Sequence, residues 1–319
     1  MKDQAVNIGS RVQGAVLGAA IGDAMGHPTE FIGSFEQIYS RYGPAGVTKF
    51  ELFWERDGKK FAPYTDDTQM AEVVLRSLLE SCQKSLDLDG TMELIGKGFV
   101  DWANNPQDGH RAPGNACLSG SRAFERGVPW YEAGGPTAGG CGSVMRAYPF
   151  GLVFAKDLKK AEEWSVAHSK LTHGDPIALA ACAAMAVGVA LCIRDENVEN
   201  ILAEMTEAAA RYSKKTAEMM TMAISEAGDG TPPQKTLQRL QGWAAHEAIA
   251  AAVYVFMRHS DDPKAAILEG ANTPGDSDSI ATLAGALVGG RCGISAIPED
   301  WVRDIERSGE LVSLAEMVV

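Results

Sequence analysis

Four glycines recur at every fourth position of an alanine-rich segment near the N-terminus; they are Gly14, Gly18, Gly22 and Gly26. If residues 12–25 form a helix, these glycines lie along one slowly drifting stripe of its surface. Each glycine weakens a helix by about 0.5–1 kcal/mol relative to alanine, so four of them indicate that another backbone, or a ligand, approaches closely. Close helix packing is the simpler of the two explanations. Gly285 and Gly289 repeat the spacing near the other end of the chain, and the two stripes can face each other.

Helical patterns dominate the rest of the sequence. Alanine-rich segments of helical length recur at residues 12–25, 67–82, 178–193, 198–227, 246–257 and 279–289. Turns rich in glycine and proline separate them, and no linker is long or biased enough to divide the chain. We therefore expect an all-α fold, with a single compact multi-helix domain over residues 1–319 and an N-terminal extension over residues 1–11.

The composition excludes several classes of function. The chain has 29 basic and 42 acidic residues, a net charge of −13, and so lacks the basic character of a nucleic-acid-binding protein. Its six cysteines form no C-x-x-C pair, which argues against a zinc knuckle and fits a reducing cytoplasmic location. The longest low-charge stretch, residues 177–193, is slightly short for a membrane span, and we expect a central buried helix there.

Two short acidic motifs stand directly before predicted helices. One is Tyr64-Thr65-Asp66-Asp67-Thr68 and the other is Gly275-Asp276-Ser277-Asp278-Ser279. Each alone is explained by helix capping, since Ser, Thr and Asp side chains accept hydrogen bonds from the first amides of a helix. Together they also suit hard divalent cations such as Mg²⁺, which take oxygen ligands. Four converging carboxylates would otherwise raise one another's pKa values, and bound metal would remove that cost.

A glycine-rich loop follows in the middle of the chain, Gly139-Gly140-Cys141-Gly142-Ser143-Val144-Met145-Arg146. A turn of this kind that leads into a helix can aim several N–H groups at one phosphate. It matches neither a Walker motif nor the full dinucleotide-binding glycine pattern, so a plain loop is the alternative. Arg146 can pair with a phosphate or form a structural ion pair.

The order and spacing of these motifs resemble the ADP-ribosylglycohydrolase family, which includes dinitrogenase-reductase-activating glycohydrolases and vertebrate ADP-ribosyl-acceptor hydrolases. The resemblance extends over residues 12–292. It rests on the striped segment 14–26 with Glu30, on Thr65-Asp66-Asp67-Thr68, on Met145-Arg146 with Pro149, on Thr172-His173-Gly174-Asp175-Pro176 and on Gly275-Asp276-Ser277-Asp278-Ser279-Ile280-Ala281.

The resemblance implies an all-α fold with a two-magnesium centre in a cleft, in which Mn²⁺ can replace Mg²⁺. The implied metal ligands are Thr65, Asp66, Asp67, Asp276, Asp278 and Ser279. The family usually has threonine at the positions of Ser277 and Ser279, and serine keeps the oxygen ligand. The glycine-rich loop is expected to cradle the diphosphate of ADP-ribose. The implied ligand-binding residues are Gly140, Cys141, Gly142, Ser143, Met145 and His173.

Two loop carboxylates are candidates for proton transfer, and a solvated surface carboxylate is the alternative for each. The resemblance places Glu30 beside the scissile ribose, and it aligns Asp108 with an aspartate that bacterial relatives have near the reacting sugar. Asp67, among the implied metal ligands, is the third residue expected at the reacting centre. Phe31 or Tyr64 can stack on a sugar or base.

The function implied is a magnesium-dependent hydrolase that removes ADP-ribose from an acceptor, with ADP-ribosylated arginine in protein as the expected substrate and free ADP-ribose as a product. Three alternatives stay open. One is a hydrolase of another linkage, to serine, to poly(ADP-ribose) or to a small molecule. The others are an immunity protein that opposes an ADP-ribosylating toxin, and a non-catalytic ADP-ribose-binding or structural protein of the same fold. The oligomeric state is not predicted.

Overall fold

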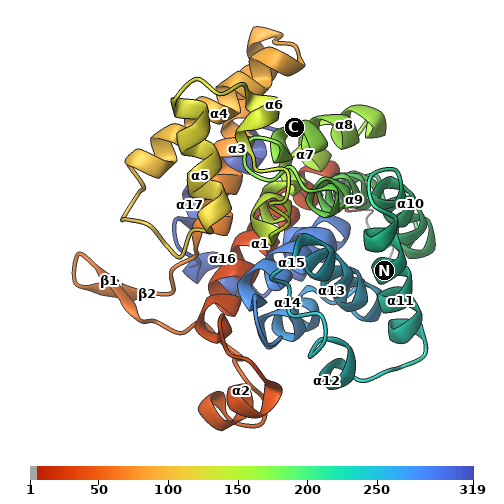
Figure 1. Cartoon of the computed structure of the whole chain (residues 1–319). Helices are drawn as coiled ribbons and strands as arrows, with labels where there is room; N and C mark the ends of the chain where they lie inside the picture. The colour runs from red at the N-terminus through yellow and green to blue at the C-terminus, as the bar shows by residue number, and fades with distance from the viewer. Residues whose placement is uncertain (1–5) are drawn as a thin grey trace.

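Two glycine-striped helices, α1 (Ile8–Gly26) and α15 (Ser277–Cys292), lie side by side at the centre of the computed structural model (Figure 1). A Cβ atom at Gly14 or Gly18 would lie closer than 3.0 Å to backbone atoms of α15. A Cβ at Gly285 would likewise collide with the carbonyl oxygen of Gly18. Close helix packing is therefore the reason for the stripe, and the prediction that the two stripes face each other is confirmed.

The structure describes residues 6–319, in which the other elements are helices of three to nineteen residues and one small hairpin. The α-helices are α2 (Phe35–Tyr42), α3 (Asp66–Lys84), α4 (Leu88–Asn104), α5 (Asn115–Glu125), α6 (Trp130–Ala133), α7 (Tyr148–Val153), α8 (Leu158–Ser169), α9 (Pro176–Ile193), α10 (Val198–Ala210), α11 (Lys214–Gly228), α12 (Pro233–Thr236), α13 (Ala245–Arg258), α14 (Pro263–Ala271), α16 (Glu299–Asp304) and α17 (Ser308–Glu316). Three short 3₁₀ helices are η1 (His27–Thr29), η2 (Cys141–Arg146) and η3 (Ile294–Ala296). Strands β1 (Trp54–Arg56) and β2 (Lys59–Phe61) pair antiparallel, with Trp54 opposite Phe61.

The helices pack around the central pair on two sides. In Figure 1, α3, α4, α5 and α6 lie to one side of α1, while α9, α10, α11 and α13 lie to the other. Helix α9 is long and apolar enough to cross a membrane by length and composition, but most of its residues are buried inside the protein. The prediction of a central buried helix at residues 177–193 is confirmed.

The predicted helical segments differ from the structure mainly at their ends. The segment at residues 198–227 is two helices, α10 and α11, because the chain turns at Ser213 and the Ser213 hydroxyl caps α11 by accepting from the Thr216 amide. Helix α1 begins at Ile8, so the last residues of the expected extension form its first turn, while residues 1–5 lie outside the described part of the chain. The buried Arg11 in this turn forms an ion pair with Asp195, 2.5 Å away.

Replacing Gly18 by alanine should destabilise the protein, because the new methyl group would have to push the α1 and α15 backbones apart. Overpacking of this kind costs about 1–3 kcal/mol in the free energy of unfolding. Gly309, in helix α17, is a matched control, since a Cβ there meets nothing within 4 Å. Gly309→Ala should stabilise by about 0.5–1 kcal/mol through helix propensity. Urea denaturation of both variants measures the difference, and equal effects would contradict the packing explanation.

Candidate active site

Helix α3 is fixed to helix α1 by one buried carboxylate. Asp23, in α1, accepts hydrogen bonds from the Thr65 amide at 2.8 Å and the Thr68 amide at 3.0 Å. It also accepts from the Thr68 hydroxyl at 2.6 Å. Because the first amides of a helix have no partner within the helix, Asp23 satisfies the N-terminus of α3 from outside. The start of α3, with Asp66 and Asp67, is thereby held against α1.

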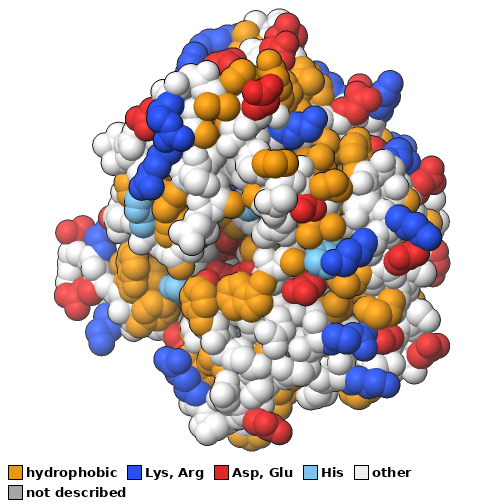
Figure 2. Space-filling view, in the orientation of Figure 1, with side chains coloured by type: hydrophobic (Ala, Val, Ile, Leu, Met, Phe, Trp, Pro, Cys, Tyr) orange, Lys and Arg blue, Asp and Glu red, His pale blue; other side chains and the backbone are white. Residues whose placement is uncertain are grey.

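The two acidic motifs meet because α1 contacts both of their helices. Helix α15 packs along the glycine stripe, so that its N-terminal Asp276 and Asp278 lie near the Asp66–Asp67 turn. The Ser279 hydroxyl donates to Asp67 Oδ2 at 2.9 Å. Asp66, Asp67, Asp276 and Asp278 are all buried but line a cavity of about 370 Å³. Figure 2 shows this hollow, with acidic side chains at its floor.

Burial and mutual repulsion dominate the electrostatics of the cavity floor. Desolvation raises the pKa values of Asp66, Asp67 and Asp276 well above their ordinary range, and the neighbouring Asp278 carboxylate raises them further. The pKa of Asp23 is raised to about 7 for the same two reasons. The buried Arg146 guanidinium acts in the opposite direction on Asp66. The floor therefore carries more carboxylates than nearby cations, an arrangement that favours a bound positive charge.

The glycine-rich loop forms one wall of the cavity through Gly140, Cys141, Gly142 and Met145. The Cys141 thiol donates to Asp276 Oδ2 at 2.6 Å, so this side chain points to the carboxylates. Its amide donates to the Trp243 carbonyl oxygen at 3.3 Å. Ser143 does not line the cavity; its hydroxyl accepts from the Ser169 hydroxyl at 2.9 Å.

Arg146 holds the glycine-rich loop through hydrogen bonds from a buried position. It is fully buried, donates to the Gly142 carbonyl oxygen and, at 2.6 Å, to the Thr172 hydroxyl, and packs over the Phe99 ring. These contacts favour a structural role over phosphate binding. The partners are uncharged oxygen and sulfur atoms, so the structural role does not come from an ion pair. His173, beside Thr172, lines the cavity, and burial together with the Arg146 charge lowers its pKa to about 3, so its imidazole is neutral.

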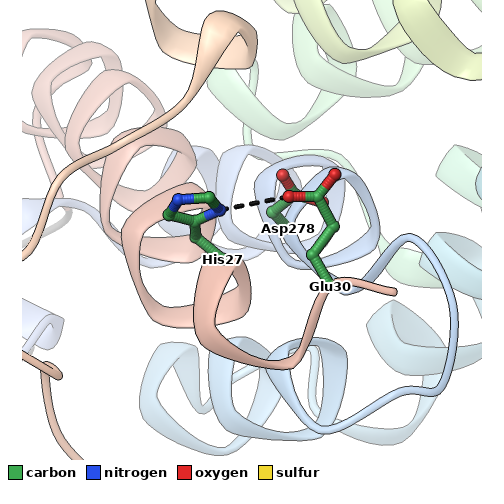
Figure 3. Close-up of side chains that lie close together, drawn as sticks. All are labelled: His27, Glu30 and Asp278. Atoms are coloured by element: carbon green, nitrogen blue, oxygen red, sulfur yellow. Dashed lines mark hydrogen bonds and ion pairs between the residues drawn. The ribbon is translucent and has the colours of Figure 1, made fainter. Parts of the chain in front are cut away.

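Glu30 lies at the edge of the carboxylate cluster, in the loop that follows η1. Its Oε2 atom is 3.1 Å from Nδ1 of His27, and Asp278 lies directly beside it (Figure 3). Burial raises the pKa of Glu30 to about 11, with further contributions from the carboxylates of Asp278, Asp276 and Asp66. Glu30 therefore belongs to the cavity and is not a solvated surface carboxylate.

An aromatic pair forms the rim next to Glu30. The Phe31 ring stacks on the Trp243 ring with centroids 5.3 Å apart, and the two side chains are 67% and 41% exposed. Two backbone hydrogen bonds fix the Phe31 loop, from the Phe31 amide to the Gly275 carbonyl at 2.9 Å and from the Gly275 amide to the Ile32 carbonyl at 2.8 Å. Tyr64, the other candidate for stacking, is buried beneath Arg111 and does not line the cavity.

Asp108 lies outside the cavity. Its carboxylate pairs with Arg56 and, at 3.2 Å, with Arg111, and neither it nor these arginines line the cavity. Arg111 also makes a two-pronged ion pair with the buried Glu306, at 2.7 and 3.0 Å. Of the two carboxylates predicted for proton transfer, the structure thus brings Glu30 to the cluster and leaves Asp108 in a surface ion-pair network.

Several residues of the site were not predicted, and three of them position or line it. Asp23 positions α3, Asn115 begins α5 at the cavity wall, and Trp243 forms the rim. Asp23 follows Gly22 in the stripe, and an acidic residue on an otherwise apolar, glycine-rich helix was a usable signal. Nothing in the local sequence marks Asn115 or Trp243. Thr65, predicted as a ligand, caps α3 by accepting from the Asp67 amide at 3.3 Å and is not part of the cavity lining.

The sequence profile of the ADP-ribosylglycohydrolase family matches residues 4–319. The chain belongs to this family. It is 26% identical to the ADP-ribosyl-[dinitrogen reductase] glycohydrolase of Rhodospirillum rubrum, over 95% of this chain and 93% of that protein. It is also 26% identical to the ADP-ribosylarginine hydrolase Tri1 of Pseudomonas putida, over 96% of this chain and 77% of that protein. A solved structure described as an ADP-ribosylglycohydrolase-related protein complex superposes with a TM-score of 0.73 at 25% identity, covering 98% of both chains.

Membership of this family makes the chain an ADP-ribosyl hydrolase, an enzyme of the glycosidase type. The all-α fold expected from the sequence is confirmed, apart from the small β1–β2 hairpin.

The free energy of unfolding should depend on pH in the chelated protein. Asp23 has an ordinary pKa of 3.8, which the folded state raises to about 7. Between these values the folded state holds a proton that the unfolded state releases. The contribution of Asp23 to the free energy of unfolding is therefore complete below about pH 4 and is lost as the pH rises through about 7. Each such group contributes a slope of at most about 1.4 kcal/mol per pH unit. Urea unfolding in EDTA between pH 5 and 7 should show stability falling with pH, less steeply in Asp23→Asn; a rising free energy would contradict the assignment.

Proposed function

We propose that this chain is a divalent-metal-dependent hydrolase that removes ADP-ribose from modified arginine in protein. The observation that carries the proposal is the convergence of Asp66, Asp67, Asp276 and Asp278 on the floor of one cavity, in a chain of the ADP-ribosylglycohydrolase family. The names of two relatives support this substrate. One is an ADP-ribosylarginine hydrolase, which favours arginine, and the other is an ADP-ribosyl-[dinitrogen reductase] glycohydrolase, which favours a modified protein.

The donor set fits Mg²⁺. Four aspartate carboxylates and the Ser279 hydroxyl at the cavity floor are oxygen donors of the kind that Mg²⁺ prefers. The Cys141 thiol also points to this floor, and burial raises its pKa well above the ordinary value, which keeps the sulfur protonated and a poor ligand. Burial disfavours their ionised forms, and a divalent cation offsets that cost. These residues, with the Thr65 hydroxyl as a further oxygen donor, would hold two ions, and the bound charge would supply orientation of the ribose hydroxyls and polarisation of the attacking water.

The reaction is the hydrolysis of the bond between ribose C1″ and the acceptor. This bond breaks, a new bond forms from C1″ to the oxygen of water, and the proton that water loses ends on the departing acceptor. Glu30 is the cavity carboxyl available to carry that proton, because it lies beside Asp278 and holds a proton readily in its buried position. The glycine-rich wall and the Phe31–Trp243 rim hold the rest of ADP-ribose in place.

A panel of linkages tests the acceptor. Proteins or peptides carrying ADP-ribose on arginine, on serine or on cysteine, and poly(ADP-ribose), are incubated with the enzyme, with and without Mg²⁺, and released ADP-ribose is quantified. Release from the arginine linkage alone, abolished by a chelator, is expected. Preferential release from another linkage would overturn the proposed acceptor, and no release from any would overturn the proposed activity.

Alanine at Asp66 or Asp278 should abolish turnover while leaving a folded protein. Loss of one of several buried, mutually repelling carboxylates need not cost stability; burial and the neighbouring Asp278 carboxylate already raise the pKa of Asp66. Turnover of the arginine-linked substrate and the urea midpoint are measured together. Near-normal turnover in both variants would show that the cavity floor is not the reacting centre.

Glu30→Gln and Asp108→Asn form a matched pair, because each removes a carboxylate charge and keeps the size of the side chain. Glu30→Gln should lower turnover by roughly 10²–10⁴, the usual contribution of a general acid–base group. Asp108→Asn should leave turnover within a few-fold, since Asp108 is paired with Arg56 and Arg111 outside the cavity. Steady-state kinetics on both variants decide which carboxylate transfers the proton. A large loss in Asp108→Asn with a small one in Glu30→Gln would assign proton transfer to Asp108.

A further inference from the structure

His27 is a nitrogen donor placed against a cluster of carboxylates. Its Nδ1 atom, a Glu30 carboxylate oxygen and an Asp278 carboxylate oxygen all lie within 4.8 Å of one another, and Figure 3 shows the three side chains pointing toward a common space. We infer that His27 is a ligand of the metal centre and makes this site favour transition metals such as Mn²⁺ over Mg²⁺. The inference rests on the metal centre of the proposed function.

The backbone leaves the residue after Gly26 little choice of position. A Cβ at Gly26 would lie 2.5 Å from Cα of Asp278, so α1 ends in direct contact with the first turn of α15. Residue 27 continues the chain from that contact, and the His27 amide donates to the Asp23 carbonyl oxygen. The imidazole is therefore held beside Asp278 by the same packing that assembles the carboxylates.

The imidazole is oriented toward the cluster rather than toward solvent. Its ring lies 5.4 Å from the Phe53 ring, and its side chain is 19% exposed. Its Nδ1 atom faces the cluster, 3.1 Å from Glu30 Oε2. Two ligands bound at about 2.0–2.2 Å to a common ion are at most about 4.4 Å apart, so small side-chain rotations bring His27 Nδ1 and the Asp278 oxygen onto one cation, while Glu30 stays free to carry its proton.

The imidazole nitrogen of His27 determines which metal ion the site prefers. Oxygen ligands alone suit Mg²⁺, whereas an imidazole nitrogen adds affinity for first-row transition ions. Mn²⁺ accepts both kinds of donor, so a mixed set of carboxylates and one histidine holds it more tightly than the carboxylates alone. A histidine that only hydrogen-bonded to Glu30 would give no such preference.

Pulsed electron paramagnetic resonance of Mn²⁺ bound to the whole chain tests the assignment without using activity. Wild-type protein should show hyperfine coupling from a directly bound histidine nitrogen, which changes from ¹⁴N to ¹⁵N character when histidine alone is labelled. The coupling should disappear in His27→Ala. His173→Gln is the matched control, because His173 also lines the cavity but does not belong to the group of potential ligands formed by His27, Glu30 and Asp278. It should keep the coupling.

Equilibrium binding gives a second, independent measurement. His27→Ala should raise the Kd of one Mn²⁺ ion at least about tenfold, the lower end of what loss of supporting groups at a metal site costs, and change the Kd for Mg²⁺ much less. Mn²⁺ that binds wild type with no histidine coupling, or a coupling lost in His173→Gln and kept in His27→Ala, overturns the role of His27 and leaves the metal centre standing. Failure of wild type to bind Mn²⁺ or Mg²⁺ at all overturns the metal centre, and this inference with it.

Discussion

The direct backbone contact between α1 and α15 is the constraint on which the site depends. Side chains normally keep two helix axes 8–10 Å apart, and the glycines at 14, 18, 22 and 26 remove them along one whole face. This contact sets the first turn of α15 against the end of α1. Asp23, inside the same helix, then fixes the first turn of α3. One helix thus aligns two others, whose acidic N-termini meet although Asp66 and Asp276 are far apart in sequence.

The buried carboxylates of the site lower the stability of the fold. Burying several carboxylates near one arginine is unfavourable, and the raised pKa values of Asp66, Asp67 and Asp276 are the measure of that cost. Favourable interactions in the rest of the protein offset this cost. Examples are the burial of the apolar helix α9 and the Arg111–Glu306 ion pair, which holds the loop before α5. Functional sites commonly store strain or repulsion that the rest of a fold must offset.

The sequence predicted the helices and the acidic helix starts, because these depend on residues close together in the chain. The helices α1, α3, α9, α13 and α15 carry their signal in alanine, glycine and capping residues, and the two acidic motifs mark their own helix starts. The hairpin also had a local signal that was missed, the Asp57-Gly58 turn, both of whose residues adopt positive φ. By contrast, Asp108 aligned with a family position but lies in an ion-pair network with Arg56 and Arg111. Trp243 is placed at the rim by the hydrogen bond that its carbonyl oxygen accepts from the Cys141 amide. Such placements depend on contacts between distant segments, which no local pattern encodes.

The pairing of α1 with α15 also governs when the cavity comes into existence during synthesis. Helix α1 ends at Gly26 and α15 begins at Ser277, so 277 − 26 = 251 residues of chain must be added before the two can meet. At about 5–20 residues per second, a ribosome needs roughly 13–50 s for that length. Throughout this interval the glycine face of α1 has no native partner, and half of the carboxylate cluster does not yet exist. The cavity therefore cannot form until α15 has been synthesised, and α1 stays without its native partner until then.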